Sequence, residues 1–196
     1  MSEGLRVRKR QRTRERIAAA AAELVMRNGL AATTADRIAE EAGIARATFF
    51  RYFESKEYAV AEGFTSAWIT AITDALRRQP AELSPTDALT AAFADLATDF
   101  DSIGDQIAEI ELRTRESLTL RAWTLLCYLN FETAIAETIA PRLPDLTVDD
   151  PRPRLLGALA MAAVRISLDD WLRDGGSLSE RISRAVTSMT VRPMTK

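Results

Sequence analysis

Residues 33–56 (TTADRIAEEAGIARATFFRYFESK) constrain the fold more than any other stretch, because they predict two short helices joined by a glycine turn. Thr33 or Thr34 supplies a hydroxyl that can cap the start of the first helix. Gly43 ends that helix, since glycine readily adopts the positive φ of a C-terminal cap. The second helix is predicted from Ala45 to Phe53.

Each predicted helix has one apolar face. The first carries apolar residues at i, i+3, i+4 and i+7, namely Ala35, Ile38, Ala39 and Ala42. The second carries Phe49 and Phe53 one turn apart, and we assign both to the core. Small residues beside the turn permit the close crossing of a helix-turn-helix, which leaves the second helix free to enter a major groove of DNA.

The segment from Gly43 to Lys56 (GIARATFFRYFESK) resembles the recognition-helix signature of the tetracycline-repressor (TetR) family of bacterial transcription regulators. Two positions depart from the family pattern. Ala45 replaces the usual Ser, which removes an N-cap side chain worth about 1 kcal/mol. Phe50 replaces the usual Tyr, whose hydroxyl contacts a phosphate in the family.

We predict that the start of the second helix reads DNA. Arg46 can bind guanine through two hydrogen bonds, and the methyl groups of Ala47 and Thr48 can contact thymine, with Arg51 beside them. The resemblance implies phosphate contacts, which fix register without reading sequence, for Thr33, Thr34, Tyr52 and Lys56. A solvated helix face or a cap is the alternative for each of these residues.

Residues 1–12 are predicted to form a flexible basic arm that enters the first helix near Thr13. Arginines at alternate positions, Arg8, Arg10 and Arg12, are expected to contact phosphates or the minor groove. A solubilising tail is the alternative. With a helix over Thr13–Arg27, residues 13–56 would form a three-helix DNA-binding domain.

The uneven distribution of charge agrees with a DNA-binding first part. The net charge of the chain is −2. Residues 1–56 hold twelve Lys and Arg against seven Asp and Glu, so they are basic, and the remainder is acidic. The chain has no His and one Cys, which excludes a Cys/His metal site and the commonest general base. We expect no enzyme activity, no cofactor, and a buried Cys127.

Periodicity predicts further helices and no strand in the rest of the chain. One long helix begins at Ser55 and closes before Pro80. The others are predicted over Ser84–Phe100, Gln106–Glu116, Thr119–Ile139, Arg154–Arg173 and a last segment opening at Ser177 or Ser179. The expected fold is therefore all-α, with about nine helices. No segment has the length of apolar sequence that spans a membrane, so we expect a cytoplasmic protein.

Residues 57–196 are predicted to form a ligand-binding and dimerisation domain. Two consecutive helices, Thr119–Ile139 and Arg154–Arg173, are apolar on more than one face, which predicts pairing with a second copy. The resemblance implies a homodimer through the last two helices. A ligand pocket, as the alternative to a packed core, is predicted from aromatic and polar residues: Phe64, Trp68, Phe93, Phe100, Arg121, Trp123, Cys127, Asn130, Phe131, Arg165 and Trp171.

The sequence therefore predicts a transcriptional repressor that binds a palindromic operator as a homodimer. A small hydrophobic effector would release it, and a looser resemblance of the second half to acyl-CoA-sensing relatives implies an acyl-CoA-like ligand. A constitutive or architectural DNA-binding protein without a ligand is the first alternative. A helical enzyme using Asp169 with Asp170, or Glu109 with Glu111, is the second, but acids at these spacings diverge on a helix.

Overall fold

The computed structural model describes residues 2–116 and 118–189, and these form ten α-helices, one short 3₁₀ helix and no strand. This confirms the predicted all-α class. The helices are α1 (Ser2–Asn28), α2 (Ala35–Glu41), α3 (Arg46–Tyr52), α4 (Lys56–Arg78), α5 (Pro85–Asp95), α6 (Ala97–Ser102), α7 (Gly104–Glu116), α8 (Leu118–Ile139), η1 (Ala140–Arg142), α9 (Arg152–Asp174) and α10 (Leu178–Thr187). No helix among the described residues is both long enough and apolar enough to cross a bilayer.

The count exceeds the predicted nine because the single helix expected over Ser84–Phe100 is divided. Ser84 caps the first piece, α5, by accepting a hydrogen bond from the Asp87 N–H at 3.1 Å. At Leu96 the backbone has φ −91° and ψ 0°, which interrupts the helical path before α6 begins. Apolar periodicity continues across Leu96, so it could not reveal this break.

The chain divides into two compact units. Unit 1 comprises Met1–Ala67 and Asp105–Thr124, and unit 2 comprises Trp68–Gly104 and Leu125–Lys196. Unit 1 is thus larger than the predicted segment 13–56. Two helices, α4 and α8, begin in unit 1 and end in unit 2.

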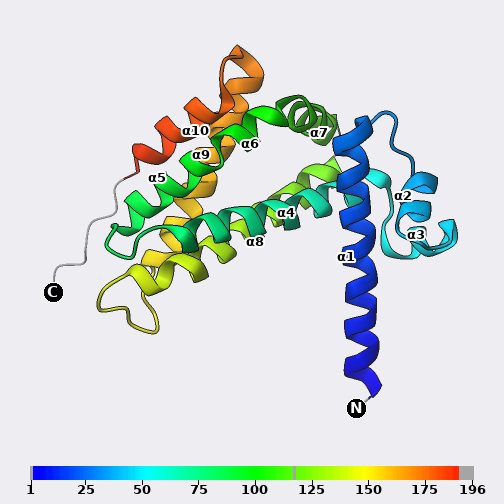
Figure 1. The fold of residues 1–196 in the computed structure, drawn as a ribbon, viewed down its shortest axis with the longest axis horizontal. Helices are drawn as coiled ribbons and strands as arrows, with labels where there is room; N and C mark the ends of the chain where they lie inside the picture. The colour runs from blue at the N-terminus through cyan, green and yellow to red at the C-terminus, as the bar shows by residue number, and fades with distance from the viewer. Residues whose placement is uncertain (1, 117, 190–196) are drawn as a thin grey trace. The chain divides into compact units, whose positions relative to one another are not determined.

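Unit 1 is built on α1, which is much longer than predicted. Its second half buries an apolar face that includes Ile17, Ala21 and Val25 against α2 and α3. Its first half is exposed from Gly4 to Arg12 and extends beyond α2 and α3 (Figure 1). The prediction that residues 1–12 form a flexible arm is therefore wrong in its conformation, because the helix begins at Ser2 rather than near Thr13.

A glycine brings α1 and α4 into close contact within unit 1. A Cβ atom at Gly63 would lie 2.0 Å from the carbonyl oxygen of Ala18, much closer than any real side-chain contact. Glycine at this position therefore permits the two backbones to approach, and it fixes where the first half of α4 meets α1.

Unit 2 packs α5, α9 and α10 around a second core. Leu178, Ile182 and Val186 form the buried stripe of α10, and Figure 1 shows α10 lying beside α5. A second glycine contact joins α8 and α9, because a Cβ atom at Gly157 would lie 2.3 Å from the carbonyl oxygen of Glu132.

Two arginines fix the loops of unit 2. Arg142 donates hydrogen bonds to carbonyl oxygens at the C-terminal end of α4, including that of Gln79 at 2.6 Å. Arg152 is 9% exposed and forms an ion pair with Asp150 at 2.6 Å, which closes the loop before α9. Hydrogen bonds from the side chain and then the backbone N–H of Arg152 lower the pKa of Asp150.

Candidate functional site

The helix-turn-helix predicted from residues 33–56 is formed by α2 and α3. Thr34 caps α2 by accepting a hydrogen bond from the Arg37 N–H at 3.3 Å. Gly43 has φ +62° and turns the chain, while the Ile44 N–H donates to the Ala39 carbonyl at 2.9 Å. Ala45 stands at the N-cap of α3 without a side-chain hydrogen bond, as its substitution for Ser predicts.

The inner face of α3 is held by aromatic packing. Phe49 is fully buried and Phe53 is 3% exposed, and their ring centroids lie 5.9 Å apart. Both predicted core assignments are confirmed. Burial of these two rings fixes the rotation of α3, so that its other side faces solvent.

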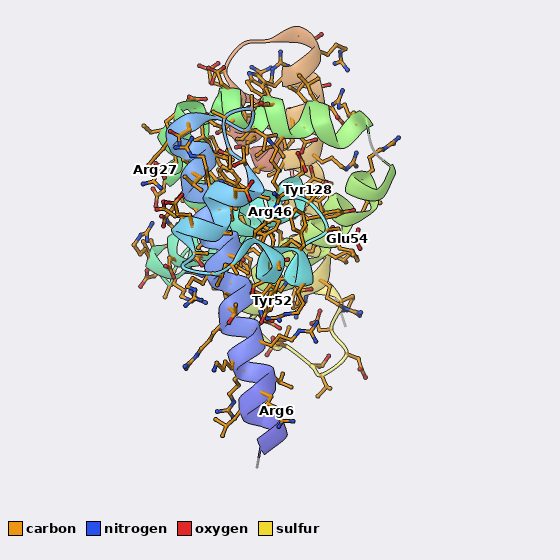
Figure 2. The ribbon with its side chains drawn as sticks, turned by 90° about the vertical axis from the view of Figure 1, so that its right-hand side faces the viewer. Arg6, Arg27, Arg46, Tyr52, Glu54 and Tyr128 are labelled. Carbon is orange, nitrogen blue, oxygen red and sulfur yellow. The ribbon has the colours of Figure 1, made fainter. Side chains whose placement is uncertain are left out.

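The exposed side of α3 carries the residues predicted to read DNA. Arg46, Ala47 and Arg51 are exposed, and Thr48 is half-buried. Figure 2 faces α2 and α3 and labels Arg46 on this side. The Arg46 guanidinium lies 3.3 Å from the Asp36 carboxylate, in an ion pair between two largely exposed side chains. Such a pair is weak in water, so the guanidinium is available to another partner.

Phe50 extends the exposed side of α3. It is 47% exposed, with its ring centroid 5.2 Å from that of Phe49 and the Arg46 guanidinium 5.6 Å from its centroid. Tyr52 is half-buried, and the Arg51 guanidinium lies 5.6 Å from its ring centroid. Cationic and aromatic groups therefore alternate along this surface.

The structure corrects one predicted phosphate contact and gives a different role to another. Thr33 is fully buried, and its hydroxyl donates to the Gly29 carbonyl at 2.9 Å, so it cannot reach a phosphate. The Lys56 ammonium is half-buried and donates to the carbonyl oxygens of Leu30 and Thr33 at 2.7 and 2.8 Å. Lys56 thus holds the loop before α2 against the start of α4.

Like Lys56, Arg14 links separate elements of unit 1, and we call such a residue a brace. Its guanidinium donates to the Tyr52 carbonyl at 2.7 Å, pairs with the Glu62 carboxylate, and lies 4.3 Å from the centroid of the Phe53 ring. It therefore ties α1 to the C-terminal end of α3 and to α4. No local sequence signal marks this role, because Arg14 is 38 residues from its carbonyl partner.

A third brace comes from α7. The Glu109 carboxylate accepts a hydrogen bond from the Leu30 N–H at 3.1 Å, and Ile110 packs against the core of unit 1. Glu109 also belongs to one of the two pairs of acids that the alternative of a helical enzyme requires. Its observed partner is a backbone amide, which gives it a structural role in positioning the loop before α2.

The three arginines predicted to contact DNA from the arm lie on a helix instead. Arg8, Arg10 and Arg12 are all exposed. With 3.6 residues per turn, Arg10 lies one turn before Arg14 on the side of α1 that meets α3, whereas Arg8 and Arg12 lie roughly opposite. Figure 2 shows Arg6, a further turn before Arg10, on the extended part of α1.

The residues predicted to form a ligand pocket are distributed over both units. Phe64 packs against the core of unit 1. In unit 2, Trp68 stacks on Phe100 at 4.5 Å, and Phe93 lies 6.5 Å from the same ring, between ring centroids. These three aromatic rings fill space by packing on one another.

The other predicted pocket residues are scattered. Cys127 is buried, as predicted; Arg121 and Asn130 are exposed; and Phe131 is half-buried. The half-buried Trp171 donates from its indole N–H to the Gly176 carbonyl at 3.0 Å. The side chain of Trp123 lies outside the described residues. Among the predicted pocket residues whose side chains are described, Arg165 lines a groove in unit 2.

That groove lies between α8 and α9 and has a volume of about 360 Å³. It is lined by Leu125, Tyr128, Leu129, Glu132, Ala158, Met161, Ala162 and Arg165. Large apolar side chains around it are exposed to solvent: Leu125, Leu126, Leu129, Leu155, Leu159 and Ile166. The apolar surface of unit 2 is thus on α8 and α9.

The exposed apolar residues lie only partly on the last two helices, through which a homodimer is predicted, and that dimer stays a prediction. The last two helices are α9 and α10, but the apolar stripe of α10 is buried inside unit 2. Its exposed positions are polar, and two of them, Glu180 and Arg184, are charged. The unpaired apolar face therefore belongs to α8 and α9, the two helices whose apolar excess the sequence reveals.

Comparison with known proteins identifies the family. The family model for bacterial regulatory proteins of the tetR family matches residues 17–60, and the model for the MftR C-terminal domain matches residues 83–192. TcmR of Streptomyces glaucescens, an HTH-type transcriptional regulator, is 32% identical over 191 residues, which cover 94% of this chain and 84% of TcmR. The chain belongs to the TetR family of transcriptional regulators.

Two further similarities extend along the whole TetR-family chain. MftR of Mycobacterium tuberculosis, a regulator named for mycofactocin biosynthesis, is 29% identical over 184 residues, covering 91% of this chain and 89% of MftR. The fold is similar to Thermus thermophilus FadR, a TetR-family repressor solved in complex with lauroyl-CoA, with a TM-score of 0.66 and 24% identity. That alignment covers 93% of this chain and 98% of FadR.

Proposed function

We propose that this TetR-family regulator is a homodimeric repressor that reads a two-fold symmetric operator with α3 and releases it on binding a small apolar effector. The observation that carries the proposal is the orientation of α3. Phe49 on its inner face and Phe53 at its C-terminal end are buried, and its first turn presents Arg46 and Ala47 to solvent. A helix held in this way can place its N-terminal end in a major groove.

Base reading would rest on the first turn of α3. Arg46 can exchange its weak ion pair with Asp36 for two hydrogen bonds to guanine, and the methyl groups of Ala47 and Thr48 suit thymine. Arg51 extends the same side of the helix. Thr34 and Tyr52 remain our proposed phosphate contacts, since they lie at the start of α2 and the end of α3.

Two half-sites require two copies of α3 at a fixed separation of about one DNA turn. The apolar face of α8 and α9 supports a second copy as the partner of unit 2. Such a dimer would bury leucine side chains that are otherwise exposed, including Leu126 at 58% and Leu155 at 50%.

The effector is proposed to act through α4. This helix begins in unit 1 at Lys56, whose ammonium fixes the loop before α2, and it ends in unit 2 at Arg78. A ligand that favours another position of α4 would change the spacing of the two α3 helices. A coupling free energy of about 1–3 kcal/mol would weaken operator binding five- to 150-fold.

An acyl-CoA is the first effector class to test, because FadR of the same fold was solved with lauroyl-CoA. The test begins by selecting bound duplexes from random DNA with the purified full chain. Binding of the selected duplex is then titrated with acyl-CoAs of graded chain length. A duplex that no acyl-CoA or other apolar metabolite releases would favour the constitutive DNA binder, and a protein without any duplex preference would refute the proposal.

A matched pair of variants tests whether α3 reads the DNA sequence. Arg46→Ala should reduce the preference for the selected duplex over random DNA by about 1–3 kcal/mol, because a two-bond contact to guanine is lost. Arg184→Ala on the exposed side of α10 removes the same charge and should leave both affinities unchanged. Equal losses on both DNAs for Arg46→Ala would contradict base reading. Fluorescence anisotropy at one fixed salt concentration measures the affinities of the unchanged chain and of both variants for both DNAs.

A further inference from the structure

The groove between α8 and α9 carries opposite charges on its two helices. Glu132 belongs to α8 and is half-buried, whereas Arg165 belongs to α9 and is exposed. Within the described residues, neither side chain forms an ion pair or a hydrogen bond inside the chain. Both lie among apolar side chains, where an unpaired charge is costly once water is excluded.

The two charges are separated along the groove. Gly157 of α9 contacts the carbonyl group of Glu132 on α8. Glu132 therefore lies beside Gly157 at one end of the groove. Arg165 lies eight residues further along α9, which corresponds to roughly 12 Å at 1.5 Å per residue. One end of the groove is therefore acidic and the other end is basic.

A two-fold axis would bring these ends together. In an isologous interface both copies use the same patch. Two residues that lie on opposite sides of the axis in one chain therefore meet each other across the interface, one from each copy. The exposed apolar stripe of α9, which includes Leu155, Leu159 and Ile166, is centred close to Met161. Glu132 and Arg165 lie on opposite sides of that centre.

We propose that a second copy of this chain covers the groove, and that Glu132 of each copy pairs with Arg165 of the other. The inference rests on the proposed homodimer and deepens it, because it assigns the register of the two copies. The apolar face supplies the buried area. The two reciprocal ion pairs select one alignment among those that apolar contact alone would permit.

Charge reversal tests this register. Glu132→Arg places two arginines at each meeting point of a homodimer, and Arg165→Glu places two glutamates there. Because like charges that meet at an interface cost free energy, each single variant should dimerise about tenfold more weakly than the unchanged chain, or weaker still. The double variant, Glu132→Arg with Arg165→Glu, restores opposite charges at both points and should regain dimerisation.

A mixture gives the sharpest test. When the two single variants are combined, the heterodimer has opposite charges at both meeting points, whereas each homodimer has like charges. Mixing two weakly associating samples should therefore yield a one-to-one dimer, measured by native mass spectrometry with one variant carrying a mass label. Glu180→Arg and Arg184→Glu, on exposed positions of α10, make a matched control pair that should dimerise like the unchanged chain.

The outcomes separate cleanly. Single variants that dimerise normally, or a mixture that fails to form the heterodimer although each variant shows a cooperative thermal transition, would overturn the proposed register. Because the measurement is mass and not DNA binding, failure of the proposed repressor function would leave it unaffected. Operator binding by a protein whose variants show no charge dependence would support the function and refute the register.

Discussion

The exposed face of α3 in unit 1 and the exposed face of α8 and α9 in unit 2 differ in chemistry, although a glycine contact underlies each unit. Gly63 brings α4 against α1, and Gly157 brings α9 against α8. In unit 1 the outward face is cationic and aromatic, as DNA requires, while in unit 2 it carries exposed leucines around a groove that Glu132 and Arg165 line. The comparison indicates that a close backbone contact fixes how two helices pack in each unit. The exposed residues then determine which kind of partner the unit binds.

The largest effects are expected from filling the two glycine contacts. Gly63→Ala and Gly157→Ala each force a Cβ atom against a carbonyl oxygen, so each should cost about 2 kcal/mol or more in unfolding free energy. Gly63→Ala should chiefly impair DNA binding, and Gly157→Ala should chiefly impair dimerisation. Chemical denaturation, anisotropy and native mass spectrometry measure the three effects.

Gly4→Ala is the control for both variants, because a Cβ atom at Gly4 meets nothing within 4 Å. Alanine is a better helix former than glycine, so this variant should be neutral or slightly more stable. If Gly63→Ala and Gly157→Ala change stability, DNA binding and dimerisation as little as Gly4→Ala does, the two backbone contacts do not fix the helix packing of the units. The comparison then fails.

A smaller effect is expected from removing the brace at the end of α3. Arg14→Met loses the hydrogen bond to the Tyr52 carbonyl and leaves Glu62 without its partner. Because both side chains are partly exposed, we expect a loss of about 1–2 kcal/mol, at the lower end of the range for charged hydrogen bonds. Arg16→Met, at an exposed position of α1, should change the stability by less than about 0.5 kcal/mol. Equal stability of the two variants would exclude Arg14 as a brace.

The helix-turn-helix could be predicted from the sequence because its signals are local. Thr34 caps α2, Gly43 turns the chain and Phe49 is buried, all within one short stretch. The braces could not be predicted, because Arg14 and Lys56 bond to carbonyl oxygens, which every residue has. A sequence pattern identifies neither the particular carbonyl that a long side chain reaches nor the helix that carries it.

The pocket prediction shows a different limit. Phe64 and Trp68 lie one turn apart on α4, so periodicity places them on one face. The chain nevertheless divides between them, and Phe64 belongs to unit 1 while Trp68 stacks on Phe100 in unit 2. Periodicity identifies a buried face but not which core receives it.

Acid should weaken the ion pair between Asp150 and Arg152 in unit 2. The pKa of Asp150 in unit 2 is lowered by Arg152, so this pair stabilises the fold above the ordinary carboxyl pKa of about 4 and is lost as the pH falls through the lowered value. Asp150→Asn should lose that stability already at neutral pH and show a shallower decrease between about pH 5 and 3. The control is Asp149→Asn, at an exposed neighbouring position. Identical pH profiles for the two variants, from chemical denaturation, would contradict the role of this pair.

The smallest effect on stability is expected from removing arginines in the exposed first half of α1. The same variants test how far the cationic face extends from α3. Arg6 and Arg10 lie on the side that Arg14 turns toward α3, whereas Arg8 and Arg12 lie roughly opposite. If the DNA duplex lies against α3, removing Arg6 and Arg10 together should weaken binding and reduce the salt slope by about 1.8, since each phosphate contact contributes about 0.9. Removing Arg8 and Arg12 deletes the same charge and should change the slope much less. Equal changes would mean that this segment contacts DNA as the flexible arm first predicted, because only a rigid helix gives its two sides different access to the phosphates.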